Sequence, residues 1–189
     1  NKTAQFGLDQ YKGLWRSIAS ADFDGDGDQD LVCGNLGLNS RYRADKKSPL
    51  ALYARDFDQN GTIDPIMCFM EKGKERPVAY RHLMIRQLPS LKKKFVRTDP
   101  YARASLRDIF PASDVEAALH FDANELATLY FENKGGRFEA KPLPTMAQIA
   151  PTNAISCADL NKDGHLDVLL VGNDHGQQVE TGRMDAGNG

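Results

Sequence analysis

Aspartate residues crowd into one short segment near the start of the chain. Residues 21–34 read ADFDGDGDQDLVCG and hold five aspartates within nine positions: Asp22, Asp24, Asp26, Asp28 and Asp30. Carboxylates at this spacing repel one another unless a cation or a basic side chain lies among them. The chemistry that suits such a segment is therefore the binding of a cation.

The same spacing occurs in three places, and all three fit the pattern D-x-[DN]-x-[DN]-G-x-x-D. Acidic loop 1 is residues 22–30 (DFDGDGDQD), acidic loop 2 is residues 56–64 (DFDQNGTID) and acidic loop 3 is residues 159–167 (DLNKDGHLD). Aspartate and glycine are common in surface turns, and a single copy would fit that simpler interpretation. Three copies in one register argue against it.

The residue types favour Ca²⁺ as the cation, with up to three sites. Calcium takes six or more oxygen ligands, and a tightly curled loop directs alternate residues toward one centre. Glycine at position 6 supplies the positive φ that curls the loop. The absence of paired His or Cys disfavours zinc and copper. The candidate ligands at positions 1, 3, 5, 7 (through its carbonyl) and 9 are Asp22, Asp24, Asp26, Asp28 and Asp30; Asp56, Asp58, Asn60, Thr62 and Asp64; Asp159, Asn161, Asp163, His165 and Asp167.

The segments beside the loops have the composition of β-strands. Apolar runs such as WRSIASADF and DLVCGN flank loop 1, and similar pairs flank the other two loops, which predicts strand–loop–strand units. An EF-hand instead needs flanking helices and an acid at position 12, where this chain has Cys33, Met67 and Leu170. Because position 5 of loop 2 is Asn60, the second site is expected to be weaker than the first.

These units resemble the FG-GAP/VCBS repeats of integrin-α-like β-propellers, in which such a loop joins two strands of one blade and binds calcium. Three further segments resemble bacterial VCBS-repeat proteins related to the ASPIC/UnbV group: NLGLNS at 35–40, LKKKF at 91–95, and ANELA with YFEN within 123–133. The resemblance implies a mainly β fold of partial propeller blades. The chain is too short for a closed ring of usual size, and it begins without Met, so we expect a piece of a longer propeller.

The long gap between loops 2 and 3 predicts a blade without a calcium loop, an insertion, or both. Residues 77–119 show helical periodicity interrupted at Pro89, and capping signals stand at Thr98 or Asp99 and in Ser113-x-x-Glu116. We therefore divide the chain into blades with loops 1 and 2 (1–76), a helical insertion (77–119) and blades with loop 3 (120–189). The strand-like runs predict a core of Trp15, Ile18, Leu31, Val32, Leu52, Tyr53, Ile66, Leu129, Phe131, Ile155, Leu169 and Leu170.

Other features of the sequence carry less information about function. Eleven bases within residues 71–110 form a basic segment that fits either an anion- or nucleic-acid-binding surface or a solvated helical face. We favour the solvated face, and nothing resembles an RNA-recognition motif. No nucleophile elbow, HExxH or phosphate loop occurs, so a non-enzymatic role is favoured. The three cysteines lie in apolar runs, as small buried residues do.

Together these features predict a calcium-stabilised binding or adhesion module at a bacterial surface or in the periplasm, with a protein or glycan ligand that the sequence does not name. The alternative from another class is a polysaccharide-active enzyme or an enzyme-associated domain. No apolar run is long enough for a membrane helix. Open propeller edges would favour a homo-oligomer.

Overall fold

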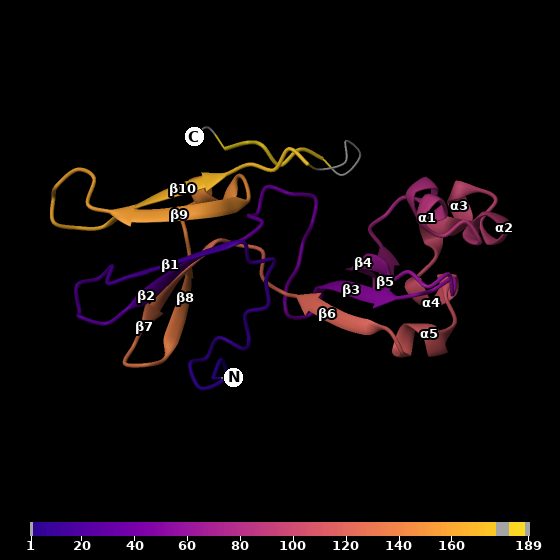
Figure 1. Cartoon of the computed structure of the whole chain (residues 1–189), viewed down its shortest axis with the longest axis horizontal. Coiled ribbons are helices and arrows are strands. Elements are labelled where there is room, and N and C mark those ends of the chain that lie inside the picture. Colours follow the sequence, from indigo (N-terminus) through magenta and orange to yellow (C-terminus); the bar gives the residue numbers. More distant parts are fainter. Residues whose placement is uncertain (1, 177–181, 188–189) are drawn as a thin grey trace. The chain divides into compact units, whose positions relative to one another are not determined.

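The computed structural model describes residues 2–176 and 182–187, and it is mainly β (Figure 1). The strands form several antiparallel sheets, and among the described residues these sheets do not close into a propeller. The chain divides into two compact units: unit 1 is Asn1–Arg43 with Glu125–Gly189, and unit 2 is Ala44–Asn124. The division into blades and an insertion, drawn above at residues 76 and 119, remains a prediction.

Unit 1 holds a four-stranded sheet and a two-stranded sheet. The four-stranded sheet has the order β1–β2–β7–β8, and β10 pairs with β9 in the other sheet. The elements are β1 (Ser17–Ala21), β2 (Asp30–Gly34), β7 (Leu129–Asn133), β8 (Phe138–Pro142), the 3-10 helix η1 (Thr145–Gln148), β9 (Thr152–Ala158) and β10 (Asp167–Gly172). Strands β7 and β8 pair as an antiparallel hairpin.

The β9–β10 pair lies against the ends of β1 and β2. Ser17 Oγ donates a hydrogen bond to the carbonyl of Thr152 (2.8 Å), and the Thr152 amide donates to the carbonyl of Asn35 (2.9 Å). Gly34 lies at this contact, where a β-carbon would stand 2.5 Å from the Thr152 carbonyl oxygen. A side chain at position 34 would therefore force the two sheets apart, which explains the glycine at the end of β2.

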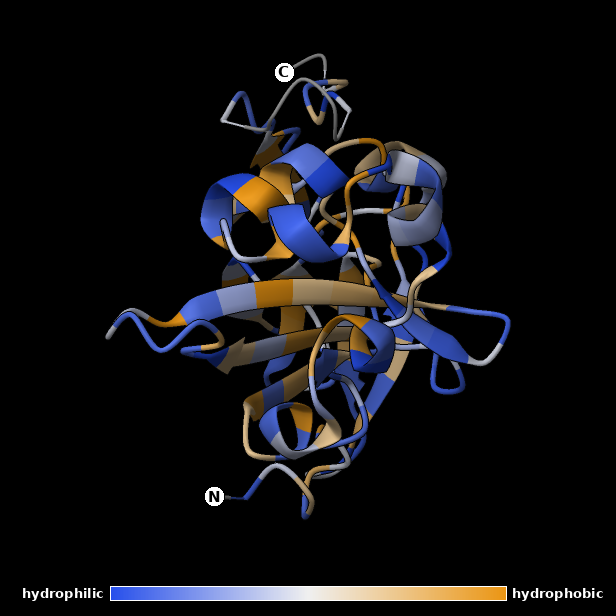
Figure 2. Cartoon of the chain, turned by 90° about the vertical axis from the view of Figure 1, so that its right-hand side faces the viewer, coloured by the Kyte–Doolittle hydropathy of each residue, from blue (hydrophilic) through white to orange (hydrophobic). Residues whose placement is uncertain are grey.

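Unit 2 is a four-stranded sheet with short helices over it. The sheet order is β5–β4–β3–β6, and the helices lie in the chain between β5 and β6. The elements are β3 (Leu50–Arg55), β4 (Asp64–Glu71), β5 (Lys74–Pro77), α1 (Arg81–Gln87), α2 (Leu91–Lys94), α3 (Thr98–Arg103), α4 (Leu106–Ile109), α5 (Ala112–Glu116) and β6 (Leu119–Ala123). In Figure 2 these short helices carry hydrophobic and hydrophilic residues within the same turns.

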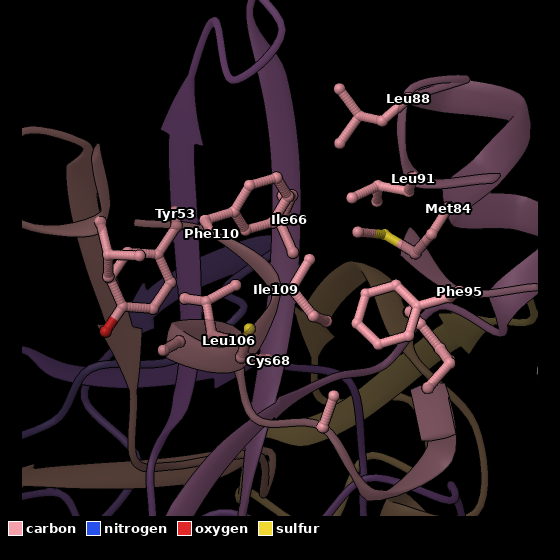
Figure 3. Packing of buried hydrophobic residues seen from close by; sticks show 14 residues of the cluster. Tyr53, Ile66, Cys68, Met84, Leu88, Leu91, Phe95, Leu106, Ile109 and Phe110 are labelled. Atoms are coloured by element: carbon pink, nitrogen blue, oxygen red, sulfur yellow. The ribbon is translucent and has the colours of Figure 1, made fainter. Parts of the chain in front are cut away.

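The core of unit 2 lies between its sheet and its helices. Ile66 and Cys68 of β4 contribute to one buried cluster together with Met84, Leu88 and Leu106 from the helical segment, as Figure 3 shows. Each fully buried aliphatic side chain contributes about 1.5–3 kcal/mol relative to exposure. The helical segment thus supplies the hydrophobic cover that its sheet needs. Burial raises the pKa of the Cys68 thiol to about 12, consistent with an unreactive core residue.

The helix boundaries agree with the sequence at Pro89 and differ at the caps. Helix α1 ends at Gln87 and α2 begins at Leu91, as the proline predicts. The predicted capping box at Ser113 is wrong: α5 begins at Ala112, and Pro111 is its N-cap residue. The capping box belongs to α4, where Ser105 accepts from the Asp108 amide and Asp108 accepts from the Ser105 amide.

The predicted core is correct for the central strands and wrong for an edge strand and the two-stranded sheet. Val32, Tyr53, Ile66, Leu129 and Phe131 are buried. Leu31, Leu52, Ile155 and Leu170 are half-buried, whereas Ile18 is 65% exposed, Leu169 50% and Trp15 37%. Ile18 lies in β1 at a sheet edge and Leu169 lies in the two-stranded sheet; within the described residues no second layer fully covers these two side chains.

Candidate metal centres

Each acidic loop connects two antiparallel strands. Loop 1 joins β1 to β2, loop 2 joins β3 to β4, and loop 3 joins β9 to β10. The first residue of each following strand is position 9 of the loop, so Asp30, Asp64 and Asp167 begin β2, β4 and β10. The strand–loop–strand units predicted from the sequence are confirmed.

One hydrogen bond ties the two ends of every loop together. The amide at position 2 donates to the carboxylate at position 9, over 3.2 Å from Phe23 to Asp30. The matching distances are 3.1 Å from Phe57 to Asp64 and 2.9 Å from Leu160 to Asp167. The position 9 carboxylate is therefore held in the same place in all three loops.

Two further hydrogen bonds recur inside the loops. The glycine amide at position 6 donates to Oδ2 of the aspartate at position 1, over 3.0 Å in loop 1, 2.8 Å in loop 2 and 3.0 Å in loop 3. The amide at position 7 donates to Oδ1 at position 5, over 3.0, 2.8 and 2.8 Å respectively. These bonds curl each loop around its acidic side chains.

The backbone explains why glycine occupies position 6. Gly27, Gly61 and Gly164 have φ of 94°, 88° and 90°, in the left-handed region that side chains disfavour. A β-carbon at these glycines would meet nothing within 4 Å. Glycine is therefore required here by the backbone conformation and not by a lack of space for a side chain. Position 4 is left-handed too, with φ of 78° at Gly25, 60° at Gln59 and 62° at Lys162.

The carboxylates of loops 1 and 2 converge. Asp22, Asp24 and Asp30 each offer one oxygen within 4.8 Å of the others. Asp56, Asp58 and Asp64 do the same in loop 2. In loop 3 position 3 is Asn161, whose amide nitrogen donates to Asp163 over 2.9 Å.

Positions 5 and 7 are arranged differently from the converging acids. Asp26 is not part of the loop 1 group, and Asp26, Asn60 and Asp163 each use Oδ1 to accept the amide two residues on. Among the residues proposed as ligands in loops 1 and 2, the described structure thus gathers positions 1, 3 and 9. The side chains of Thr62 and His165 are exposed.

The chemistry of the donors fits a hard divalent cation. The converging groups are carboxylates, which suit calcium or magnesium. Two carboxylate oxygens, Oδ1 of Asp58 and Oδ1 of Asp28, are shielded from solvent and have no hydrogen-bond partner. A shielded carboxylate oxygen without a partner is costly, and a cation bound among the loop 2 acids would provide a partner for Asp58.

Electrostatics in loop 1 reflects the crowding of its acids. Partial desolvation raises the pKa of Asp24, and the neighbouring Asp26 and Asp30 raise it further. Desolvation likewise raises the pKa of Asp28, together with the charge of Asp26. In loop 3 the pKa of Asp163 is lowered, because the His165 amide and the Asn161 side chain donate hydrogen bonds to its carboxylate.

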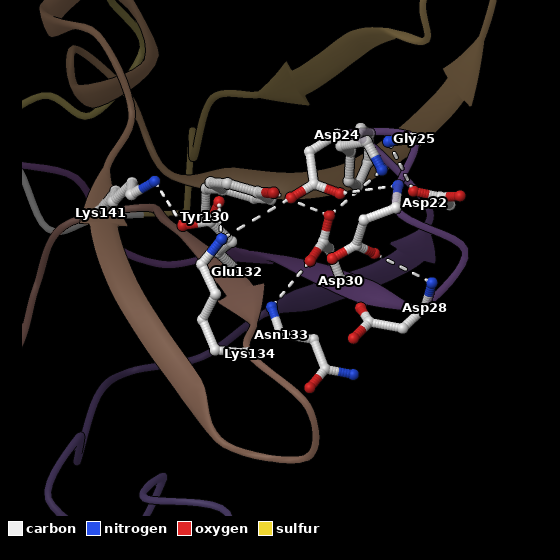
Figure 4. A network of polar contacts seen from close by, with 12 residues as sticks. Asp22, Asp24, Gly25, Asp28, Asp30, Tyr130, Glu132, Asn133, Lys134 and Lys141 are labelled. Atoms are coloured by element: carbon white, nitrogen blue, oxygen red, sulfur yellow. Dashed lines mark hydrogen bonds and ion pairs between the residues drawn. The ribbon is translucent and has the colours of Figure 1, made fainter.

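Acidic loop 1 has a second set of contacts from the β7–β8 hairpin, a hundred residues away in the chain (Figure 4). Asp30 is fully buried. Its carboxylate accepts from Tyr130 Oη (2.7 Å) and from the Asn133 amide (2.8 Å). The Phe23 ring at position 2 packs edge-on against Tyr130, with centroids 5.9 Å apart.

Two lysines and a glutamate complete this network. Lys134 Nζ lies 2.7 Å from Glu132 Oε1 and 4.0 Å from Asp24 Oδ2. Lys141 Nζ lies 2.5 Å from Glu132 Oε2. Hydrogen bonds from Lys134 and Lys141 lower the pKa of Glu132 to about 2. Sequence reasoning missed all of these hairpin residues, because contacts between segments so distant in the chain leave no local pattern.

Part of the basic segment makes contacts inside unit 2. Arg76, Arg81 and Lys94 donate to backbone carbonyls of Ala102, Phe95 and Ile109. Arg103 and Arg107 form ion pairs with Asp99 and Glu116. These contacts account for part of the basic composition without an external anion.

The histidines are not gathered into one site. His120 stacks on Tyr53 with centroids 4.7 Å apart, and His82 stacks on Tyr80 at 6.2 Å. His175 Nδ1 lies 3.8 Å from Asp185, which also pairs with Arg183. The neighbouring Asp174 pairs with Arg16 at 3.2 Å.

Comparison with known proteins finds one repeat. A family model described as an FG-GAP repeat matches residues 14–44, a segment that contains β1, loop 1 and β2. No curated protein and no solved structure matches the chain. Among the described residues no helix has the length and apolar character required to cross a bilayer.

Proposed function

We propose that this chain is a calcium-binding part of a β-propeller that serves as a binding or adhesion module. The observation that carries the proposal is the shared geometry of the three loops, which use the same three hydrogen bonds and the same left-handed positions. The FG-GAP match over loop 1 supports the same conclusion independently. The relation to VCBS-repeat proteins of the ASPIC/UnbV group belongs to this proposal.

The residues that would hold calcium are the converging acids of loops 1 and 2 and their equivalents in loop 3. Two carboxylates about 4 Å apart repel by about 1 kcal/mol in water and about 4 kcal/mol at an effective dielectric of 20. A bound cation attracts both carboxylates. This attraction outweighs their mutual repulsion and holds the loop in its curled conformation. Asp24 and Asp58 would bind through side-chain oxygens, and position 7 through its carbonyl.

Metal binding would act on the fold through the strands that the loops join. An unfolded chain has no preformed site, so binding free energy adds to folding free energy. Calcium sites of extracellular modules have dissociation constants of about 10⁻⁴–10⁻³ M. Such affinities suit an environment rich in calcium, and together with the resemblance to bacterial VCBS-repeat proteins they support our proposal of a bacterial surface or periplasmic location.

The test is a calcium titration followed by thermal unfolding. At a calcium concentration a hundred times the dissociation constant, one site adds about 2.7 kcal/mol, and we expect EGTA to lower the melting temperature. Magnesium should restore it less well, because its small octahedral shell fits a flexible loop poorly. Asp58→Ala should remove part of the calcium response.

The matched control is Asp45→Ala. Asp45 accepts amides from Lys47 and Ser48 in a turn of its own, outside the acidic loops. This variant should melt at a lower temperature yet respond to calcium as the parent does. A melting curve that calcium and EGTA leave unchanged would refute the proposed function.

A further inference from the structure

Lys134 is a basic side chain that lies within ion-pair distance of an acid of loop 1. Its Nζ lies 4.0 Å from Asp24 Oδ2, and the side chain is 48% exposed. It stands in the turn between β7 and β8, and β7 pairs with β2 directly after loop 1.

The position of Lys134 is fixed by contacts on both sides. Glu132, on the same hairpin, holds its Nζ at 2.7 Å. The Asn133 amide donates to Asp30 over 2.8 Å, and the Asn133 side chain donates to the carbonyl of Gln29 over 3.2 Å. The hairpin turn is therefore attached to loop 1 through residues adjacent to Lys134.

We propose that Lys134 sets the cation affinity of acidic loop 1 by acting as a tethered positive charge that competes with calcium. This inference rests on the proposed function, since it assumes that loop 1 binds the metal. Without calcium Lys134 offsets part of the repulsion among the acids; with calcium it opposes the incoming charge. Glu132 limits this opposition, because it draws the ammonium group away from Asp24.

The competition has an expected size. A unit charge at about 4 Å contributes about 1 kcal/mol in water, and Lys134 and Asp24 are both accessible to solvent. Since 1.4 kcal/mol corresponds to a tenfold change in an equilibrium constant, removal of the charge should tighten calcium binding at loop 1 about fivefold. Salt should reduce the difference, because the Debye length falls from about 10 Å at 0.1 M to about 3 Å at 1 M.

Tyr130 provides a readout specific to loop 1. Its hydroxyl lies 2.7 Å from Asp30, so Tb³⁺ bound in this loop should emit light after excitation of the tyrosine. The dissociation constant of Ca²⁺ then follows from its displacement of Tb³⁺. Tyr130→Phe identifies the part of the emission that comes from loop 1.

The decisive variants are Lys134→Met and Lys134→Arg, with Lys141→Met as the matched control. Lys141 contacts the same glutamate but forms no ion pair with the described acids of loop 1. Lys134→Met should tighten Ca²⁺ binding about fivefold at 0.1 M salt and less than twofold at 1 M salt. Lys134→Arg and Lys141→Met should stay within twofold of the parent.

A second variant should change the Ca²⁺ affinity in the opposite direction. Glu132→Gln frees Lys134 to approach Asp24 and should weaken Ca²⁺ binding, whereas in a Lys134→Met background it should have little effect. If Lys134→Met leaves the affinity unchanged or weakens it, or if Glu132→Gln acts equally in both backgrounds, the inference is wrong. If the parent shows no Tyr130-dependent Tb³⁺ signal and no calcium response, it is the proposed function that fails.

Discussion

Acidic loops 1 and 3 have the same backbone conformation and very different surroundings. In loop 1 the β7–β8 hairpin binds the carboxylate of Asp30 and covers Phe23. In loop 3, at the end of a two-stranded sheet, Leu160 at position 2 is 65% exposed. The nonapeptide alone therefore encodes the loop conformation, while contacts from distant segments decide how firmly a loop is tied to the fold.

The largest expected difference between loops 1 and 3 is in the stability lost when the aspartate at position 9 is replaced. Asp30→Ala removes the acceptor of two amides and a tyrosine hydroxyl, and stranded buried donors cost about 1–3 kcal/mol each. We expect a loss of about 3 kcal/mol in the free energy of unfolding, measured by urea denaturation in EGTA. Asp167→Ala removes the bond from Leu160 and should cost about 1 kcal/mol. Equal losses would show that the hairpin contributes nothing.

Replacing the residue at position 2 should also cost more stability in loop 1 than in loop 3, but the difference should be smaller. Phe23 is half-buried against Tyr130, so Phe23→Ala should lower the free energy of unfolding by about 1–2 kcal/mol. Leu160→Ala changes an exposed side chain and should stay within about 0.5 kcal/mol of the parent. Denaturation curves of both variants in EGTA provide the measurement. If Leu160→Ala lowers the free energy of unfolding by more than this, the Leu160 side chain is covered in solution.

Position 4 tests the similarity of the loops rather than their difference. Lys162 and Gln59 adopt left-handed backbone angles, which cost a residue with a β-carbon about 1–2 kcal/mol. Glycine relieves that strain but loses more conformational freedom on folding, so Lys162→Gly and Gln59→Gly should each stabilise the protein by about 0.5 kcal/mol. Gly25→Ala should destabilise it, and thermal unfolding can compare the three. Stabilisation by Gly25→Ala would contradict the shared conformation.

The smallest expected effect is the part of the pH dependence of stability that comes from Glu132, a residue of the hairpin beside loop 1. The folded-state pKa of Glu132 is lowered from 4.5 to about 2, so its stabilising effect is fully present above about pH 4.5 and is lost as the pH falls toward 2. Unfolding midpoints measured across this range should fall more steeply for the parent than for Glu132→Gln. Parallel curves would exclude a contribution from this glutamate.

The sequence predicted the parts of this molecule that depend on neighbouring residues. The three loops, their flanking strands and the break at Pro89 follow from local spacing and backbone preferences, and each is present. The exposure of Ile18 and Leu169 was not predictable, because an apolar strand residue has the same pattern whether or not another layer covers it.

In the candidate site, too, only the features that depend on neighbouring residues were predictable from the sequence. Positions 1, 3 and 9 of the loops could be read from a nine-residue pattern, but Tyr130, Asn133 and Lys134 could not. Their contacts with Asp30, Gln29 and Asp24 depend on the pairing of β2 with β7. A basic residue after a strand has no signal of its own that would connect it to an acid a hundred positions earlier.

The interruption of unit 1 by unit 2 has a consequence for the order of folding. Cys33 of β2 pairs with Leu129 of β7, so the chain between them must be synthesised before this pair can form. Unit 2 is continuous, and pairing of Leu50 with Ala123 brings its two ends together. If it folds first, the flexible chain between Cys33 and Leu129 shortens to about twenty residues, which lowers the entropic cost of closure by roughly 1 kcal/mol. We therefore expect the inserted unit to complete its sheet first and so to hasten the formation of the strand pairing around it.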